Sequence, residues 1–361
     1  MNSDLSMGSA RPGAALDMPH RMSRPQPRVM PYGHFSNSRA GIKRLVEAAV
    51  CALIIAGCGR NGRVEEKTGA RKQKELISVS GAWALYPLMV QWAAEYCRHH
   101  PATRIDVTAG GAGKGVTDVL AGAVDIAMVS REVHQEEIER GAWTLPVVKD
   151  AVVVTVNARN PALNALAAKG ISSKEAAGIW KDAAITNWRQ TGVEFDAPLR
   201  AYTRSDACGA SETFAAWFGA RQEEIRGVAV YGDPGIAEAV RRDVMGIGYN
   251  NIAFAYDRST GKPVEGLSIL PLDADCNGKA DPDELVVEDL RKLTAAVAAG
   301  KYPSPPARTL YLILKGPPVR AEIIGFLNWI LAEGQGLAAD SGYIPLDNAN
   351  LADARRKLAA R

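Results

Sequence analysis

The sequence predicts an α/β protein of two lobes joined by a two-strand hinge. From Glu75 onward, short apolar strands alternate with helices, which is the pattern of α/β folds. Two long apolar strands, at residues 151–156 and 309–314, bracket an inserted set of α/β elements, which indicates a second lobe connected through both strands. We expect lobe 1 to comprise residues 76–155 and 306–350. Lobe 2 is then formed by residues 156–305.

The elements of the first lobe can be read in order. Residues 76–80 form a strand, and the helix after it is recognised by apolar residues at helical spacing: Leu85, Leu88, Met89, Trp92 and Tyr96. A strand at 104–108, a glycine-rich turn, a helix from Val116 and a buried strand at 124–129 follow. In the second lobe we expect a strand at 199–203, a helix at 212–218 and a strand near 247–249.

Composition excludes several classes of protein. The 361 residues, 47% hydrophobic and 23% charged, suffice for about two globular domains. The net charge of +3 arises from residues 1–58, which carry seven basic and three acidic groups, so the remainder is near neutral. This balance argues against nucleic acid as a partner, because nucleic-acid-binding domains concentrate basic residues. The five cysteines show neither a disulfide framework nor metal-ligand spacing.

Residues 1–58 predict an export leader with an N-terminal extension. Lys43 and Arg44 precede an apolar run at 45–56, which is shorter than the roughly 20 residues that span a bilayer. The run ends in Ile-Ala-Gly-Cys, which resembles a bacterial lipobox and makes Cys58 the expected lipidation site, with residues 59–75 as a tether. We therefore expect an exported protein, in the periplasm or at the cell surface, anchored to the membrane by lipid. A buried helix that ends in Gly-Cys is the alternative, and Glu47 favours it slightly.

Three strand-to-helix turns could form a site. They span residues 80–87, 110–115 and 204–211, and the second is complemented by Ser130-Arg131 one strand later. Small residues allow the backbone to approach a ligand, and N–H groups at a helix N-terminus bind anions. Arg131 and Arg204 could add fork-shaped contacts to an oxyanion. A lone turn of this kind is better explained by tight packing, but three of them together indicate an anion site between the lobes.

The ordered motifs of these turns resemble those of PstS-type phosphate-binding proteins. They are Ser-Gly-x-x-Ala-Leu-Tyr-Pro (80–87), Gly-Gly-Ala-Gly-Lys-Gly (110–115), Val-Asp-Ile-Ala-Met-Val-Ser-Arg (124–131), Lys-Asp-Ala (149–151) and Tyr-Thr-Arg-Ser-Asp (202–206). The likeness extends over nearly all of residues 76–347. It implies the periplasmic-binding-protein type II (Venus flytrap) fold and the role of substrate-binding component of an ABC importer. Such a protein binds inorganic phosphate between its lobes, docks on the permease subunits, and is neither an enzyme nor a carrier of an organic cofactor.

The resemblance also implies ligand-binding residues. They are Ala84, Leu85 and Tyr86, mainly through backbone N–H groups; Ala112 and Gly113; Ser130 and Arg131; and Arg204, Cys208, Gly209, Ala210 and Ser211. The chain departs from the family where Cys208-Gly209-Ala210 replaces the common Ser-Gly-Thr, where Ala112 replaces a serine, and where a first-turn hydroxyl is absent. Each lost hydroxyl donor contributes about 0.5–1.5 kcal/mol, so another oxyanion is the open alternative.

Residues 273–284 match the spacing of a 12-residue calcium loop. Oxygen-bearing residues occupy positions 1, 3, 5, 9 and 12, and Gly278 occupies position 6. The expected ligands of a structural Ca²⁺ ion are Asp273, Asp275, Asn277, Lys279 through its carbonyl group, Asp281 and Glu284. A solvated, aspartate-rich surface turn is the alternative.

Two other functions are alternatives to anion transport. Cys208 at a helix start could be an activated thiol, but none of the five histidines lies in a glycine-rich turn to act as its base. A phosphate sensor, which would report the anion to a partner, has the same sequence features as a transport component. In either binding role we expect Arg204→Ala to weaken anion binding more than tenfold while leaving folding intact.

Overall fold

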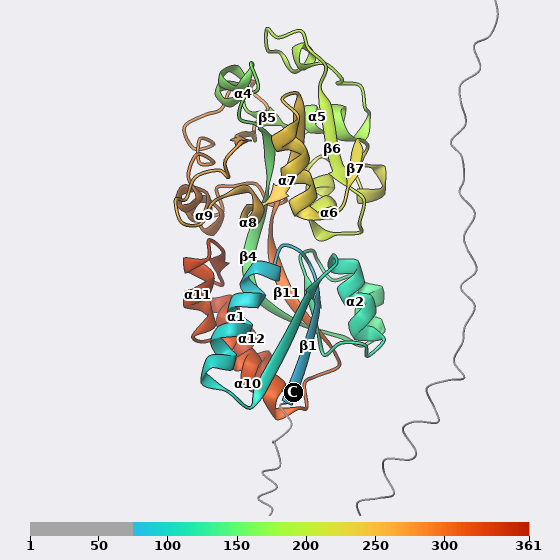
Figure 1. Cartoon of the computed structure of the whole chain (residues 1–361), viewed down its shortest axis with the longest axis vertical. Coiled ribbons are helices and arrows are strands. Elements are labelled where there is room, and N and C mark those ends of the chain that lie inside the picture. Colours follow the sequence, from blue (N-terminus) through green and yellow to red (C-terminus); the bar gives the residue numbers. More distant parts are fainter. Residues whose placement is uncertain (1–74, 361) are drawn as a thin grey trace, which may run out of the picture. The chain divides into compact units, whose positions relative to one another are not determined.

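Two apolar cores divide the folded part of the chain into two lobes (Figure 1). The structure, a computed structural model, describes residues 75–360. One core draws on residues 77–148 and 310–358, and the other on residues 151–307 together with Ile344. The first lobe therefore includes the C-terminal helix, beyond the boundary at residue 350 that the sequence suggested. The predicted leader, Cys58 and all of the tether except Glu75 lie outside the described residues.

The first lobe is a mainly parallel sheet covered by helices. Strands β1 (Glu75–Gly81), β2 (Thr103–Ala109) and β3 (Ile126–Val129) are parallel, in the order β2-β1-β3. Their connections contain α1 (Tyr86–His99) and α2 (Ala112–Leu120), as parallel strands require a crossover. The remaining helices of this lobe are α3 (Gln135–Glu139), α10 (Ala321–Ile330), α11 (Gly334–Asp340) and α12 (Asn348–Ala359).

The hinge consists of two antiparallel strands that pass through both cores, which confirms the sequence prediction. Strand β4 (Ala142–Asn157) pairs with β11 (Ala307–Lys315) along the whole of β11. The first half of β4 packs in the core of lobe 1 and the second half in the core of lobe 2. Figure 1 shows both strands running from one lobe into the other. Because β4 is buried along most of its length, it reads as an almost continuous apolar run.

The second lobe continues the same sheet on the other side of β4. The order is β4-β8-β6-β7, with β9 and β12 also paired to β4. The strands are β6 (Arg200–Arg204), β7 (Val228–Val230), β8 (Gly246–Asn251), β9 (Leu267–Leu270) and β12 (Ile344–Pro345), with a separate pair of β5 (Ile171–Ser172) and β10 (Leu272–Asp273). The helices are α4 (Leu163–Lys169), α5 (Ser173–Ala176), α6 (Gly209–Trp217), α7 (Gly232–Arg242), α8 (Ile252–Ala255) and α9 (Leu290–Ala298).

Aromatic packing fixes helix α6 on strand β8. The ring of Phe214 stacks on Tyr249 with centroids 4.4 Å apart and meets Trp180 edge-on at 5.0 Å. All three side chains are fully buried. Because stacked and edge-on rings add to the free energy of burial, this cluster holds the N-terminus of α6 firmly at the lobe boundary. Within residues 75–360, none of the helices has the length and apolar character needed to cross a bilayer.

Candidate anion site at the lobe interface

The second and third predicted turns contact each other across the lobe interface. A Cβ atom on Gly111, just before α2, would lie 2.6 Å from the carbonyl oxygen of Ala207 in the opposite lobe. A Cβ atom on Gly209, the first residue of α6, would lie 2.1 Å from the carbonyl oxygen of Ser130. No side chain fits at either position, so glycine is required here for the two backbones to meet. The structure therefore brings together turns that lie about a hundred residues apart in the chain.

In the first turn, most of the backbone donors are already used. The N–H groups of Leu85 and Tyr86 both donate to the carbonyl of Ala82, at 3.2 Å. Within residues 75–360, the N–H group of Ala84 has no backbone acceptor, while its carbonyl accepts from the hydroxyl of Tyr343 at 2.7 Å. Of the three residues expected from this turn, Ala84 thus retains a donor, whereas the donors of Leu85 and Tyr86 close the turn itself.

The second turn presents the start of α2. Gly110 and Gly111 donate to the carbonyl of Gly81 at 3.0 and 3.1 Å, and α2 then begins at Ala112. The N–H groups of Ala112 and Gly113 belong to the first turn of the helix and so have no acceptor within it. Lys114 is turned away from this role, because its ammonium group pairs with Asp118.

The third turn presents the start of α6. Cys208 is the N-cap residue, and its Sγ accepts from the N–H of Ser211 at 3.5 Å. The hydroxyl of Ser211 contacts the Tyr249 hydroxyl at 2.7 Å, within a buried network under the helix. Gly209 and Ala210 therefore offer the free first-turn N–H groups. Burial raises the pKa of the Cys208 thiol, which keeps it protonated and unlike an activated nucleophile.

Arg204 is held by two carboxylates of its own lobe. Its Nε and Nη2 donate to Asp206 at 2.8 and 2.5 Å, and its Nη1 donates to Asp233 at 2.5 Å. Asp233 is itself fixed by two hydrogen bonds from Asn251, at 2.9 and 2.7 Å. Burial is the largest single effect and opposes the charge of Arg204, but the attraction of Asp233, Asp206 and the Cys208 sulfur together outweighs it, so the pKa of the guanidinium is raised. Three of the five N–H donors of this group are engaged, which leaves two for a ligand.

Arg131 is paired with carboxylates from both lobes. Its Nη1 and Nη2 donate to Glu137 of the same lobe at 2.8 and 2.6 Å. Its Nε lies 3.1 Å from Oε2 of Glu212, which belongs to α6 of the other lobe. Burial is the largest single effect and opposes the charge of Arg131, but Glu137 and Glu212 together outweigh it and raise the pKa of the guanidinium. The guanidinium that the sequence assigned to the anion is thus occupied largely by protein groups.

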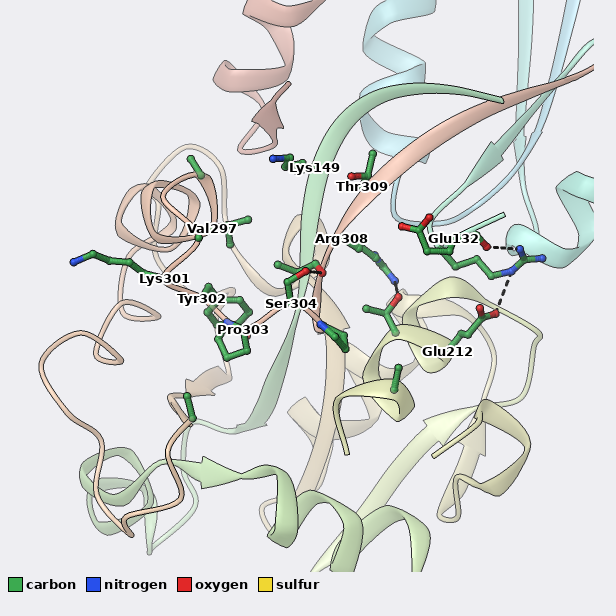
Figure 2. Close-up of a pocket in the computed structure, with 18 residues that line it drawn as sticks. Glu132, Lys149, Glu212, Val297, Lys301, Tyr302, Pro303, Ser304, Arg308 and Thr309 are labelled. Carbon is green, nitrogen blue, oxygen red and sulfur yellow. Dashed lines mark hydrogen bonds and ion pairs between the residues drawn. The ribbon is translucent and has the colours of Figure 1, made fainter. Parts of the chain in front are cut away.

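A cavity of about 880 Å³ lies beside this ion pair, along the hinge (Figure 2). Figure 2 shows Glu132 and Glu212 at one end and Tyr302 with Pro303 at the other, with Arg308 between them. Arg308 of β11 donates to Asp150 of β4 at 3.2 Å, to Thr213 of α6 at 3.1 Å and to the side chain of Asn251. Burial raises the pKa of Asp150 to about 6, although Arg308 opposes the rise.

Sequence reasoning missed several residues of the interface. The carboxylate partners Glu137, Glu212 and Asp233 were not predicted, although Asp233 lies in a Gly-Asp-Pro-Gly sequence that could have drawn attention to it. Trp83 was not predicted either. Its ring contacts Tyr231 and Phe254 of the opposite lobe, with centroids 6.0 and 6.4 Å apart.

The calcium-loop segment folds so that three of its expected ligands converge. The carboxylates of Asp273, Asp275 and Glu284 offer oxygen atoms within 4.8 Å of one another, and Gly278 has a φ of +84°. Asp273 is buried and accepts from the N–H groups of Asn277 and Gly278, at 3.0 and 2.9 Å. Asn277 is hydrogen-bonded to this group, because its amide donates to Asp275 at 3.0 Å and also to Asp281 at 2.8 Å. Asp281 is not one of the three convergent carboxylates, and it pairs with the Lys279 side chain. Three convergent carboxylates suit a hard cation such as Ca²⁺.

A model of the PBP superfamily domain matches residues 64–333 of the chain. The chain belongs to this superfamily. It is 28% identical over 290 residues to the protein SphX of Synechococcus elongatus, covering 77% of this chain and 79% of SphX. It is 27% identical over 306 residues to the phosphate-binding protein PstS of Bacillus subtilis, covering 82% and 91%. An ABC-type phosphate transport receptor from Vibrio cholerae superposes with a TM-score of 0.57 at 21% identity, over 75% of this chain and 100% of the receptor, and so shares the fold.

Proposed function

We propose that this protein binds inorganic phosphate between its lobes and delivers it to the permease subunits of an ABC importer. The observation that carries the proposal is the convergence of α2 and α6, whose N-termini approach each other from opposite lobes beside Arg204. Helix N-termini are suited to phosphate because their N–H groups and dipoles both favour an anion. The relatives named phosphate-binding proteins support phosphate over other oxyanions.

The anion in this proposal is held mainly by backbone donors. The N–H groups of Ala84, Ala112, Gly113, Gly209 and Ala210 are available within the three turns. Arg204 adds its two remaining N–H groups from a fixed orientation, because Asp206 and Asp233 hold the guanidinium. These donors compensate for the hydroxyl groups that Cys208, Ala210 and Ala112 do not provide.

Asp206 is the candidate for distinguishing phosphate from sulfate. A Cβ atom on Gly111 would lie 3.2 Å from Oδ2 of Asp206, so this carboxylate borders the second turn. Phosphate at neutral pH carries a proton that it can donate to a carboxylate, whereas sulfate carries none and would be repelled. In this proposal Asp206 therefore accepts a hydrogen bond from bound phosphate.

The first test is isothermal titration of the chain from residue 59, stripped of bound anions, with phosphate and then with sulfate. Tight one-to-one binding of phosphate with little response to sulfate is the expected result. Equal binding of both anions would contradict the proposed role of Asp206. No response to either anion would contradict the proposal that the protein binds phosphate. In the last case another oxyanion becomes the candidate ligand.

We also propose that the chain is exported and anchored through lipid on Cys58, a residue outside the described part of the structure. The lipobox-like sequence ending at Cys58 supports this placement, as does the transport role. Cys58→Ser should release the protein from the membrane fraction of the expressing cell and abolish labelling by a radioactive fatty acid. Unchanged labelling would contradict it. A sensor role would be favoured if deletion of the gene altered phosphate-responsive transcription but left phosphate uptake intact.

The loop at 273–284 is proposed as a structural Ca²⁺ site, on the support of the convergent carboxylates of Asp273, Asp275 and Glu284. Because an ion that binds only the folded chain stabilises it, 1 mM CaCl₂ should raise the melting temperature relative to EDTA by about 2–4 °C. Asp273→Asn should abolish this rise, whereas Asp283→Asn, a change of an exposed neighbour outside the expected ligands, should keep it. An equal rise in wild type and Asp273→Asn would place any ion elsewhere.

A further inference from the structure

We infer that Arg131 and His134 of the first lobe, together with Glu212 of the second, form an interlobe clasp that holds the anion cleft closed. The clasp sets anion affinity without contacting the anion. This inference rests on the proposed function for its main readout, and it replaces the role of direct anion ligand that the sequence suggested for Arg131.

The contacts of Glu212 define the clasp. Oε2 of Glu212 lies 3.1 Å from Nε of Arg131, and Oε1 lies 3.0 Å from Nε2 of His134. One carboxylate of α6 thus binds two basic side chains that follow β3 in the opposite lobe. The Arg131 side chain is 8% exposed and that of Glu212 is 30% exposed, so solvent screens this pair less than an ordinary surface pair.

Arg131 has little capacity left for an anion. Besides its ion pair with Glu212, it donates twice to Glu137 and once to the carbonyl of Glu132, at 2.9 Å. Three of the five N–H donors of the guanidinium are therefore hydrogen-bonded to protein atoms, and its Nε faces the Glu212 carboxylate in an ion pair. Glu137 serves as a brace within the first lobe, since its bidentate contact fixes the plane of the group that reaches across to Glu212.

The clasp acts on the helix that carries the anion donors. Glu212 lies in the first turn of α6, within three residues of Gly209 and Ala210. Its partners lie just beyond Ser130, whose carbonyl faces Gly209 across the interface. Separating the lobes would move the N-terminus of α6 away from Arg131, so the pair exists only in the closed arrangement. Any free energy in this pair therefore favours the conformation in which both lobes contact the anion.

Electrostatics alone predicts the opposite effect of Glu212. A carboxylate near an anion site repels the anion, so removing its charge should strengthen binding if Glu212 has no other role. If Arg131 were a ligand, freeing it from Glu212 should strengthen binding further. The clasp instead predicts that removing the charge weakens binding. The two explanations thus differ in the sign of one measured change.

The test compares Glu212→Gln with Glu136→Gln, an exposed acidic residue of α3 in the first lobe. Phosphate titration should show about three- to tenfold weaker binding for E212Q and unchanged binding for E136Q. Arg131→Gln should weaken binding to a similar extent, and the double variant R131Q/E212Q should be no weaker than either single variant, since both remove one interaction. Tighter or unchanged binding by E212Q would overturn the clasp.

A second measurement separates this inference from the proposed function. Small-angle X-ray scattering of the ligand-free protein should give a larger radius of gyration for E212Q than for wild type and E136Q. This readout does not depend on phosphate. If the wild-type protein binds no phosphate, the proposed function fails while scattering still decides the clasp. Identical scattering of the three proteins, with unchanged melting temperatures, would reject it.

Discussion

Arg204 and Arg131 lie at the same interface and are each paired with two carboxylates, yet the origin of those carboxylates differs. Asp206 and Asp233 belong to the lobe of Arg204, whereas Arg131 is bound by Glu137 of its own lobe and Glu212 of the other. A pair within one lobe survives when the lobes separate, and a pair across the interface does not. The first arrangement therefore orients a binding group in advance, and the second makes closure itself favourable.

The comparison also shows that neither arginine makes the site positive. Each arginine is outnumbered by its two carboxylate partners, so neither group offers a net positive charge to an anion. Recognition must depend on fixed N–H donors at the helix N-termini and on the orientation of Arg204. This conclusion explains why small residues dominate the three turns.

Among these predictions, replacing Arg204 should have the largest effect on stability and on phosphate binding. Arg204→Ala leaves the fully buried Asp233 without its charge partner, and removal of one member of a buried ion pair costs about 3–5 kcal/mol. We therefore expect this variant to be less stable than the wild type, in contrast to the sequence-based expectation that it folds normally. Arg204→Lys keeps the charge but loses the fork, and we expect phosphate binding at least about tenfold weaker by titration.

Arg200→Lys provides the control for this prediction. Arg200 begins the same strand, is exposed, and pairs with Asp243 at 2.5 Å. It should bind phosphate as wild type does. Comparable losses in R200K and R204K would mean that the measured effect comes from the strand and not from the anion site.

Asp150 and Arg308 form a buried ion pair between the two hinge strands. Burial raises the pKa of Asp150 to about 6, so the folded chain holds this proton more tightly than the unfolded chain, whose value is near 3.9. The resulting stability is fully present below about pH 4 and is lost as the pH rises through about 6. From the shift of about two pH units, we expect the lost contribution to be about 2–3 kcal/mol.

Urea unfolding of wild type and Asp150→Asn between pH 4 and pH 7.5 checks this expectation. The free energy of unfolding of wild type, relative to the variant, should fall over the range from pH 4 to 6.5 and stay constant above it. A difference that is independent of pH would show that Asp150 ionises normally in the folded chain.

The salt dependence of phosphate affinity tests the conclusion that backbone donors bind the anion. Because Arg131 and Arg204 are each paired with two carboxylates, screening should change phosphate affinity by less than about threefold between roughly 50 and 500 mM NaCl. Titrations at several salt concentrations measure this directly. A loss of tenfold or more would reveal a positive field that the paired arginines do not account for.

Cys208 should give the smallest effect. Its Sγ faces Ser211 inside the helix cap, so Cys208→Ser should change phosphate affinity by less than about twofold. The buried thiol should also resist iodoacetamide at neutral pH, while the exposed Cys276 reacts, as mass spectrometry can show. Rapid labelling of Cys208 would revive the thiol-enzyme alternative.

Much of the fold could be predicted from the sequence because it depends on local patterns. The alternation of strands and helices, and the two apolar strands at 151–156 and 309–314, were sufficient to predict two lobes and a two-strand hinge. The exact point at which β4 leaves one core for the other was not predictable. Apolar residues continue through the crossing, and periodicity does not reveal which core they enter.

Some features of the site could likewise be predicted from the sequence, and others could not. The sequence by itself determined which turns could expose N–H groups, because small residues after a strand and before a helix have that local consequence. The tertiary structure alone decided which donors remain free and which carboxylate each arginine meets. Glu212 lies 81 positions after Arg131, and Asp233 lies 29 after Arg204, so no local pattern joins them. The Arg204–Asp233 pairing depends on packing within the second lobe, and the Arg131–Glu212 pairing depends on how the two lobes meet.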